Sequence, residues 1–104
     1  MIKKKYIDIA KKYAKLIENE GISVDGLYLF GSRIRGGGHK WSDLDVSVVS
    51  SDFGKDRIAE MAKLFYLASK VSGLIEPHSF SLDQFDDKYD SLAQEVKKTG
   101  VRVI

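Results

Sequence analysis

Two short apolar runs, LYLF at 27–30 and LDVSVV at 44–49, lie on either side of a polar, glycine-rich segment. In the second run Leu44, Val46 and Val48 alternate with polar residues, as expected when strand side chains point alternately to the two faces of a sheet. The pattern predicts two strands joined by a long turn, with a polar face at the start of the second strand. Such a chain can bring the end of the first strand and the start of the second together at one end of the sheet.

Helical patterns surround these strands. From Lys3 to Glu20, apolar residues recur at helical spacing up to Gly21, a residue suited to a left-handed cap. A second helix is predicted from about Arg57 to Val71, capped by Asp56. Its second half, around 64–68, is apolar nearly all the way round, which suits either a buried position in the core or a contact surface.

The C-terminal part predicts a third strand over LIEPHSFSL at 74–82, in which Pro77 implies an edge position or a bulge. A last helix is expected from about Asp90 to Thr99, followed by VRVI as a short strand or packing tail. Helices alternating with strands indicate an α/β (α+β) fold, a small mixed β-sheet flanked by helices. The expected order is helix, strand, strand, helix, strand, helix, in one domain spanning 1–104.

Composition restricts the function further. A chain of 104 residues has room for one core and for no second domain to hold a substrate. The absence of cysteine excludes thiolate chemistry, and a net charge of +2 gives no overall case for nucleic-acid binding. No apolar stretch is long enough for a membrane span, and we expect a cytoplasmic protein.

Asp43 and Asp45 are the first candidate site residues. Two residues apart at a strand start, their carboxylates leave the same face and can converge on one centre. Two like charges held together need a cation, and Mg²⁺ prefers oxygen ligands of this kind. Taken alone, the pair is equally typical of an ordinary turn at the start of a strand.

The segment upstream predicts a phosphate site. Gly31 permits a tight turn that exposes backbone amides, and Ser32 adds a hydroxyl donor. Arg33 and Arg35 can neutralise the charge of a triphosphate. Separately, these residues also fit a plain turn and a solvated face. The glycine and lysine spacing of a P-loop is absent, and the dinucleotide-binding fingerprint fails for lack of its third glycine.

Together, Gly-Ser, ten intervening residues and Asp-x-Asp resemble the nucleotidyltransferase signature of the DNA polymerase β superfamily. The chain length and the form GSRIRG resemble the minimal nucleotidyltransferases within it. The resemblance implies a nucleotidyltransferase fold and a bound nucleoside triphosphate with two Mg²⁺ ions. An acceptor hydroxyl would attack, and pyrophosphate would leave. Gly31 and Ser32 would hold the terminal phosphates, and Asp43 and Asp45 the metals.

The resemblance also implies a third carboxylate from a later strand, as a metal ligand and as base on the acceptor. Glu76 is the sole acidic residue of the predicted third strand. The family more often has Asp there, and Pro77 adjoins it, so an exposed edge-strand acid is the alternative and Asp83 the fallback ligand. His78 shares the strand parity of Glu76 and could contact phosphate or orient the carboxylate, but we expect it to be packed or at the surface.

The preferred function is transfer of AMP from ATP to a hydroxyl on a partner protein. Minimal members of the family are commonly antitoxins paired with a HEPN-domain toxin, which implies adenylylation of a tyrosine on that toxin. Self-association through the apolar half of the second helix is an alternative partner arrangement. A binding module that neutralises a partner without turnover is the competing function, and Trp41, Lys40 and His39 are left without an assigned role.

Overall fold

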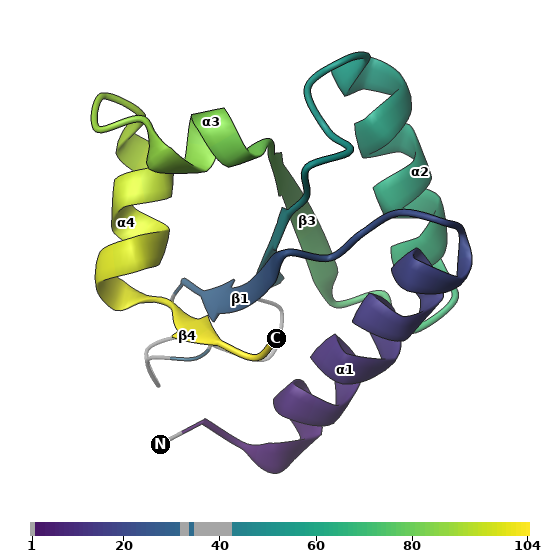
Figure 1. Cartoon of the computed structure of the whole chain (residues 1–104). Helices are drawn as coiled ribbons and strands as arrows, with labels where there is room; N and C mark the ends of the chain where they lie inside the picture. Colours follow the sequence, from purple (N-terminus) through teal and green to yellow (C-terminus); the bar gives the residue numbers. More distant parts are fainter. Residues whose placement is uncertain (1, 32–33, 35–42) are drawn as a thin grey trace.

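A computed structural model describes residues 2–31, 34 and 43–104. Within these residues, four helices and four strands follow one another (Figure 1): α1 (Lys4–Asn19), β1 (Gly26–Phe30), β2 (Leu44–Val49), α2 (Arg57–Ser69), β3 (Ile75–Phe80), α3 (Leu82–Asp86), α4 (Ser91–Thr99) and β4 (Val101–Arg102). Among the described residues, no helix combines the length and the apolar character that crossing a membrane requires.

The strands form one mixed sheet in the order β3-β2-β1-β4. Strand β1 runs antiparallel to β2 and β4, whereas β2 and β3 are parallel and are connected through α2. The predicted α/β class, with a small mixed sheet flanked by helices, is confirmed. Pro77 lies in an edge strand, where a residue without a backbone N–H is tolerated.

Helices cover the two faces of the sheet in pairs. On one face Leu44, Val46 and Val48 are fully buried, and α1 and α2 pack together over them. The hydroxyl of Tyr13 in α1 donates a 2.8 Å hydrogen bond to the backbone oxygen of Leu64 in α2, which holds the two helices together inside the core. Figure 1 shows this pair of helices on one side of the strands and α3 with α4 on the other.

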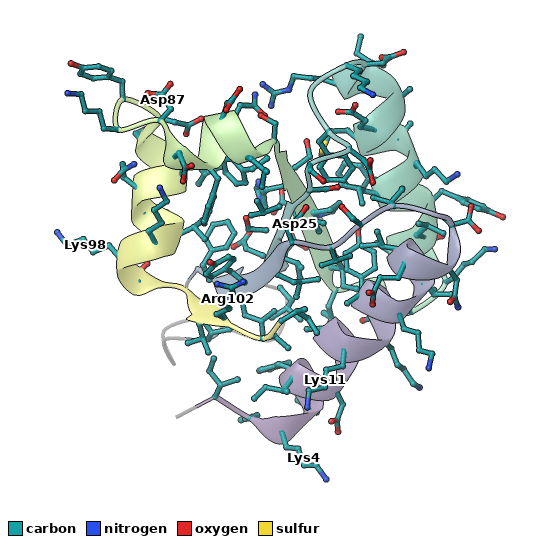
Figure 2. The ribbon with its side chains drawn as sticks, viewed as in Figure 1. Lys4, Lys11, Asp25, Asp87, Lys98 and Arg102 are labelled. Atoms are coloured by element: carbon teal, nitrogen blue, oxygen red, sulfur yellow. The ribbon has the colours of Figure 1, made fainter. Side chains whose placement is uncertain are left out.

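The second face is only partly covered. The Phe85 ring of α3 packs against Tyr28 of β1 and Phe80 of β3, with ring centroids 5.1 and 5.5 Å apart. These contacts anchor α3 and α4 over one end of the sheet. Lysines occupy the outer surfaces: the labelled Lys4, Lys11 and Lys98 extend away from the core in Figure 2.

Most predicted elements are confirmed, including the caps. Asp56 accepts a hydrogen bond from the backbone N–H of Ala59 at the start of α2, and Gly21 has the left-handed φ of 83°. The end of the third strand was predicted wrongly. Strand β3 stops at Phe80, because Ser81 and Gln84 form a reciprocal capping box that starts α3. The S-x-x-Q spacing at 81–84 was the available signal.

The apolar half of α2 divides between the core and the surface. Leu64, Leu67 and Ala68 are buried, as expected for the core, while Phe65 and Tyr66 are 50% and 61% exposed. Successive residues of a helix point about 100° apart, so the consecutive apolar residues 64–68 cannot all face the core. The two exposed aromatic rings therefore lie on the outer surface of the helix.

Candidate active site

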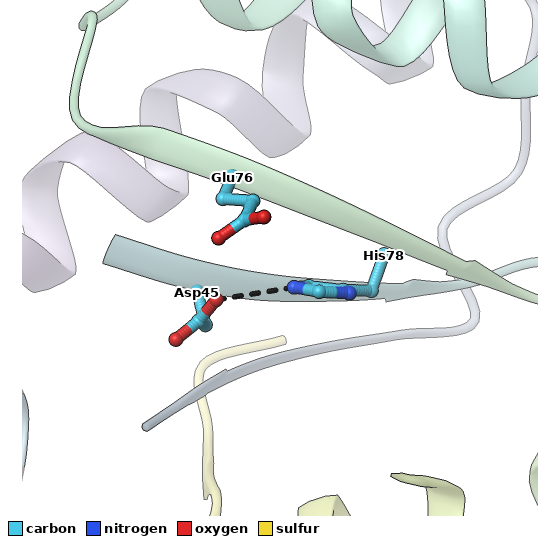
Figure 3. Close-up of side chains that lie close together, drawn as sticks. All are labelled: Asp45, Glu76 and His78. Atoms are coloured by element: carbon cyan, nitrogen blue, oxygen red, sulfur yellow. Dashed lines mark hydrogen bonds and ion pairs between the residues drawn. The ribbon is translucent and has the colours of Figure 1, made fainter. Parts of the chain in front are cut away.

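The parallel pairing of β2 and β3 places two candidate carboxylates side by side. Asp45 of β2 is in register with Glu76 of β3 and, on its other side, with Phe30 of β1. Side chains in register on neighbouring strands leave the same face of a sheet. This is also the face of Tyr28 and Phe80, opposite the one covered by α1 and α2. The close-up in Figure 3 shows both carboxylates on this face.

His78 completes the cluster. Its imidazole Nε2 lies 3.1 Å from Asp45 Oδ1, and the two side chains are 25% and 24% exposed. Because a carboxylate can only accept a hydrogen bond, Nε2 is the donor. The ring also packs against Phe30, with centroids 5.2 Å apart and planes tilted by 58°. His78 is thus packed, as expected, and it also contacts Asp45, so it can orient that carboxylate.

The three side chains can supply one ligand atom each within 4.8 Å of one another, a group able to hold a metal ion. The negative charges of Asp45 and Glu76 favour binding of a cation. Partial burial, followed by the hydrogen bond and the negative charge of Asp45, raises the pKa of Glu76, and Asp43 adds to the rise while His78 opposes it. Two carboxylates that repel each other in this way gain stability when a divalent cation lies between them.

Gly31 lies directly against Asp45 at the end of β1. It has a φ of 90°, and a Cβ built there would lie 3.2 Å from Asp45 Cγ and still closer to Oδ2. Glycine is therefore required twice, for the backbone conformation and for the space next to the carboxylate. The turn that leaves β1 begins within contact distance of the acidic cluster.

Asp43 precedes β2 and is exposed. Among the described residues it is not part of the three-residue cluster. It lines a surface cavity together with Glu76, and its charge contributes to the raised pKa of that residue. Asp83 is exposed in α3 and is also outside the cluster, so Glu76 is the better placed of the two candidates for a third carboxylate.

The remaining candidates lie outside the described residues. They are Ser32, Arg33 and Arg35 of the expected phosphate site, and His39, Lys40 and Trp41 before the aspartates. Of the residues expected to bind phosphate, the structure therefore describes Gly31 alone.

Comparisons with known proteins find solved structures of similar fold. A crystal structure of a toxin-antitoxin with AMP-PNP is 27% identical, with a TM-score of 0.68, covering 91% of this chain and 72% of that one. A crystal structure of the toxin-antitoxin MntA-HpeT, a mutant with two aspartates changed to glutamate, is 24% identical with a TM-score of 0.65. The match covers 91% of this chain and 71% of that one.

A putative nucleotidyltransferase from Sulfolobus solfataricus shares the fold, at 19% identity and a TM-score of 0.63, covering 94% of this chain and 78% of that one. No curated protein sequence matches the chain significantly. The sequence profile described as "Polymerase beta, Nucleotidyltransferase" matches residues 5–104. The chain therefore belongs to the polymerase β nucleotidyltransferase family, and its similarity to toxin-antitoxin proteins agrees with the minimal type.

Proposed function

We propose that this protein is a metal-dependent nucleotidyltransferase that transfers AMP from ATP to a hydroxyl group of a partner protein. The observation that carries the proposal is the contact between Gly31, at the turn expected to bind phosphate, and Asp45, which pairs with Glu76. A metal bound by the carboxylates would then lie next to the triphosphate, as this reaction requires.

The donor set fits Mg²⁺. Asp43, Asp45 and Glu76 would hold two Mg²⁺ ions through carboxylate oxygens, the kind of ligand that Mg²⁺ prefers. When bound, the metal supplies electrostatic stabilisation of the charge that develops on the phosphate oxygens. We assign His78 a positioning role, because its Nε2–H donates to Asp45 and restricts the orientation of that carboxylate.

The chain's own residues would divide the remaining tasks. Backbone amides at Gly31 and Ser32 would hold the terminal phosphates, with Arg33 and Arg35 neutralising their charge. The Glu76 carboxylate would accept the proton of the attacking hydroxyl.

The acceptor is proposed to be a toxin of the HEPN type, with this chain as its antitoxin. Two similar structures are toxin-antitoxin proteins, one of them with the ATP analogue AMP-PNP.

Label transfer tests the proposal directly. The purified chain is incubated with α-labelled ATP, Mg²⁺ and the protein encoded by the neighbouring gene. We expect label on the partner with the wild type and with Asp8→Asn, an exposed substitution in α1 that makes the same change of charge. We expect none with Asp45→Asn. A tight complex without transfer from the wild type would instead favour the non-catalytic module.

A further inference from the structure

A surface cavity of about 340 Å³ opens between α2 and the start of β3. Asp43 and Glu76 line one part of it, and Phe65, Ala68 and Ile75 line the rest together with small polar residues. The cavity thus joins two of the candidate catalytic carboxylates to the outer side of α2. Its volume is within the range of known ligand sites, roughly 300–1,000 Å³.

An apolar stripe on α2 continues this cavity along the helix. Ile58, Ala62 and Phe65 are all exposed, and Ile58 and Phe65 have exposed fractions of 86% and 50%. Their spacing of four and three residues places them on one side of the helix. Single exposed apolar residues are ordinary, but here three are aligned and end at the candidate site. We call the cavity and this stripe the α2 groove.

The described lining of the cavity does not favour a polyanionic acceptor such as a nucleic acid. Among the described residues that line it, the charged side chains are the carboxylates Asp43 and Glu76, and none is a lysine, arginine or histidine. Nucleic acids are bound mainly through basic side chains that neutralise phosphates. The lining is suited instead to a neutral, largely apolar group.

The location of the cavity relative to Gly31 also matters. Gly31 contacts Asp45 from the side of β1, whereas the cavity borders Asp43, the start of β3 and α2. In phosphoryl and nucleotidyl transfer, the attacking and leaving oxygens are roughly in line on opposite sides of the phosphorus. If the leaving pyrophosphate lies towards the Gly31 turn, an approach through the cavity would bring the attacking hydroxyl to the carboxylates from a different side.

We propose that the α2 groove is the docking site of the acceptor: a partner-protein segment that presents a hydroxyl-bearing side chain between apolar residues. The hydroxyl lies in the cavity near Glu76, and the neighbouring apolar side chains cover Phe65 and Ile58. This inference rests on the proposed function and adds to it the direction of approach and the chemical character of the acceptor. A small free acceptor would leave the stripe on α2 uncovered.

Two adjacent aromatic residues provide a matched test. Phe65 lines the groove, whereas Tyr66 is similarly exposed on the same helix but does not line the cavity. The probes are 15-residue synthetic peptides with one central tyrosine flanked by leucines or by serines. Label transfer from α-labelled ATP and binding of a fluorescent ATP analogue with Mg²⁺ are measured for the wild type, Phe65→Ser and Tyr66→Ser.

We expect the wild type to label the leucine-flanked peptide faster than the serine-flanked one. Phe65→Ser should reduce that rate by about tenfold, a typical effect for an aromatic contact in an interface. Tyr66→Ser should change it by less than about twofold. Both variants should bind the ATP analogue as the wild type does, because Phe65 and Tyr66 lie outside the nucleotide site.

Several results would overturn the inference while leaving the proposed function intact. They are equal labelling of the two peptides, equal losses in the two variants, and no labelling of either peptide by a wild type that binds Mg·ATP. Labelling of the chain's own tyrosines in place of the peptides would identify a second copy as the occupant. A wild type that does not bind Mg·ATP would refute the proposed function, and the docking proposal with it.

Discussion

Replacing Gly31 by alanine should damage the candidate site in two separable ways. Alanine at a φ of 90° is in a left-handed conformation, which costs an L-residue about 1–2 kcal/mol. In addition, the new Cβ would overlap the Asp45 carboxylate and force it to rotate. An off-rotamer side chain costs roughly 0.5–1.5 kcal/mol, so the total loss of unfolding free energy should be about 1.5–3.5 kcal/mol.

Gly21→Ala is the matched control. Gly21 has a similar φ of 83°, but no atom lies within 4 Å of the position of its Cβ. Urea denaturation of the two variants therefore separates the backbone cost from the cost of displacing Asp45. We expect Gly31→Ala to be less stable than Gly21→Ala by about 1 kcal/mol, equivalent to about 4–8 °C in Tm for a domain of this size.

Metal affinity is the second quantity to compare between Gly31→Ala and Gly21→Ala. Calorimetric titration with Mn²⁺ should show at least a tenfold weaker affinity for Gly31→Ala, because even indirect disturbance of a ligand costs roughly 10- to 100-fold. Gly21→Ala should bind Mn²⁺ as the wild type does. Equal stability of the two variants, together with unchanged Mn²⁺ affinity in Gly31→Ala, would refute the contact between the turn and Asp45.

Three further predictions concern the charges and the core. The pKa of Glu76 is raised above 4.5 in the folded chain, so the folded state binds the proton more tightly than the unfolded state does. The unfolding free energy of the metal-free wild type should therefore fall, relative to that of Glu76→Gln, as the pH rises above 4.5. Parallel curves in urea titrations would contradict this. Tyr13→Phe should cost about 1 kcal/mol, because it removes the buried hydrogen bond between α1 and α2, whereas the exposed Tyr66→Phe should stay within about 0.5 kcal/mol in the same denaturation assay. His78→Ala should weaken Mn²⁺ binding in calorimetry by roughly tenfold through the lost hydrogen bond to Asp45, and unchanged affinity would count against the positioning role.

The elements that could be predicted from the sequence are those with local signals. The helical periodicity of α1, the cap at Asp56, the left-handed Gly21 and the edge position of Pro77 each depend on neighbouring residues or on backbone chemistry. The family could be recognised because its signature, from Gly31 to Asp45, lies in one continuous segment.

Features that depend on contacts between distant segments could not be predicted in the same way. The register that pairs Asp45 with Glu76 is set by packing of the whole crossover through α2, and the contact between His78 and Asp45 follows from that register. Likewise, the run LFYLA at 64–68 does not reveal its orientation, so the sequence could not separate buried Leu64 from exposed Phe65. The exposed part is the one that carries the docking proposal.

The central claim is that Asp45 and Glu76 hold a divalent metal next to a triphosphate at the Gly31 turn. A crystal structure of the chain with Mn²⁺ and a non-hydrolysable ATP analogue tests this most directly, because anomalous scattering locates the metal independently of the protein. We predict Mn²⁺ coordinated by both carboxylates, with phosphate oxygens at Gly31. Nucleotide bound elsewhere, or Mn²⁺ that leaves Asp45 and Glu76 uncoordinated, would contradict the account.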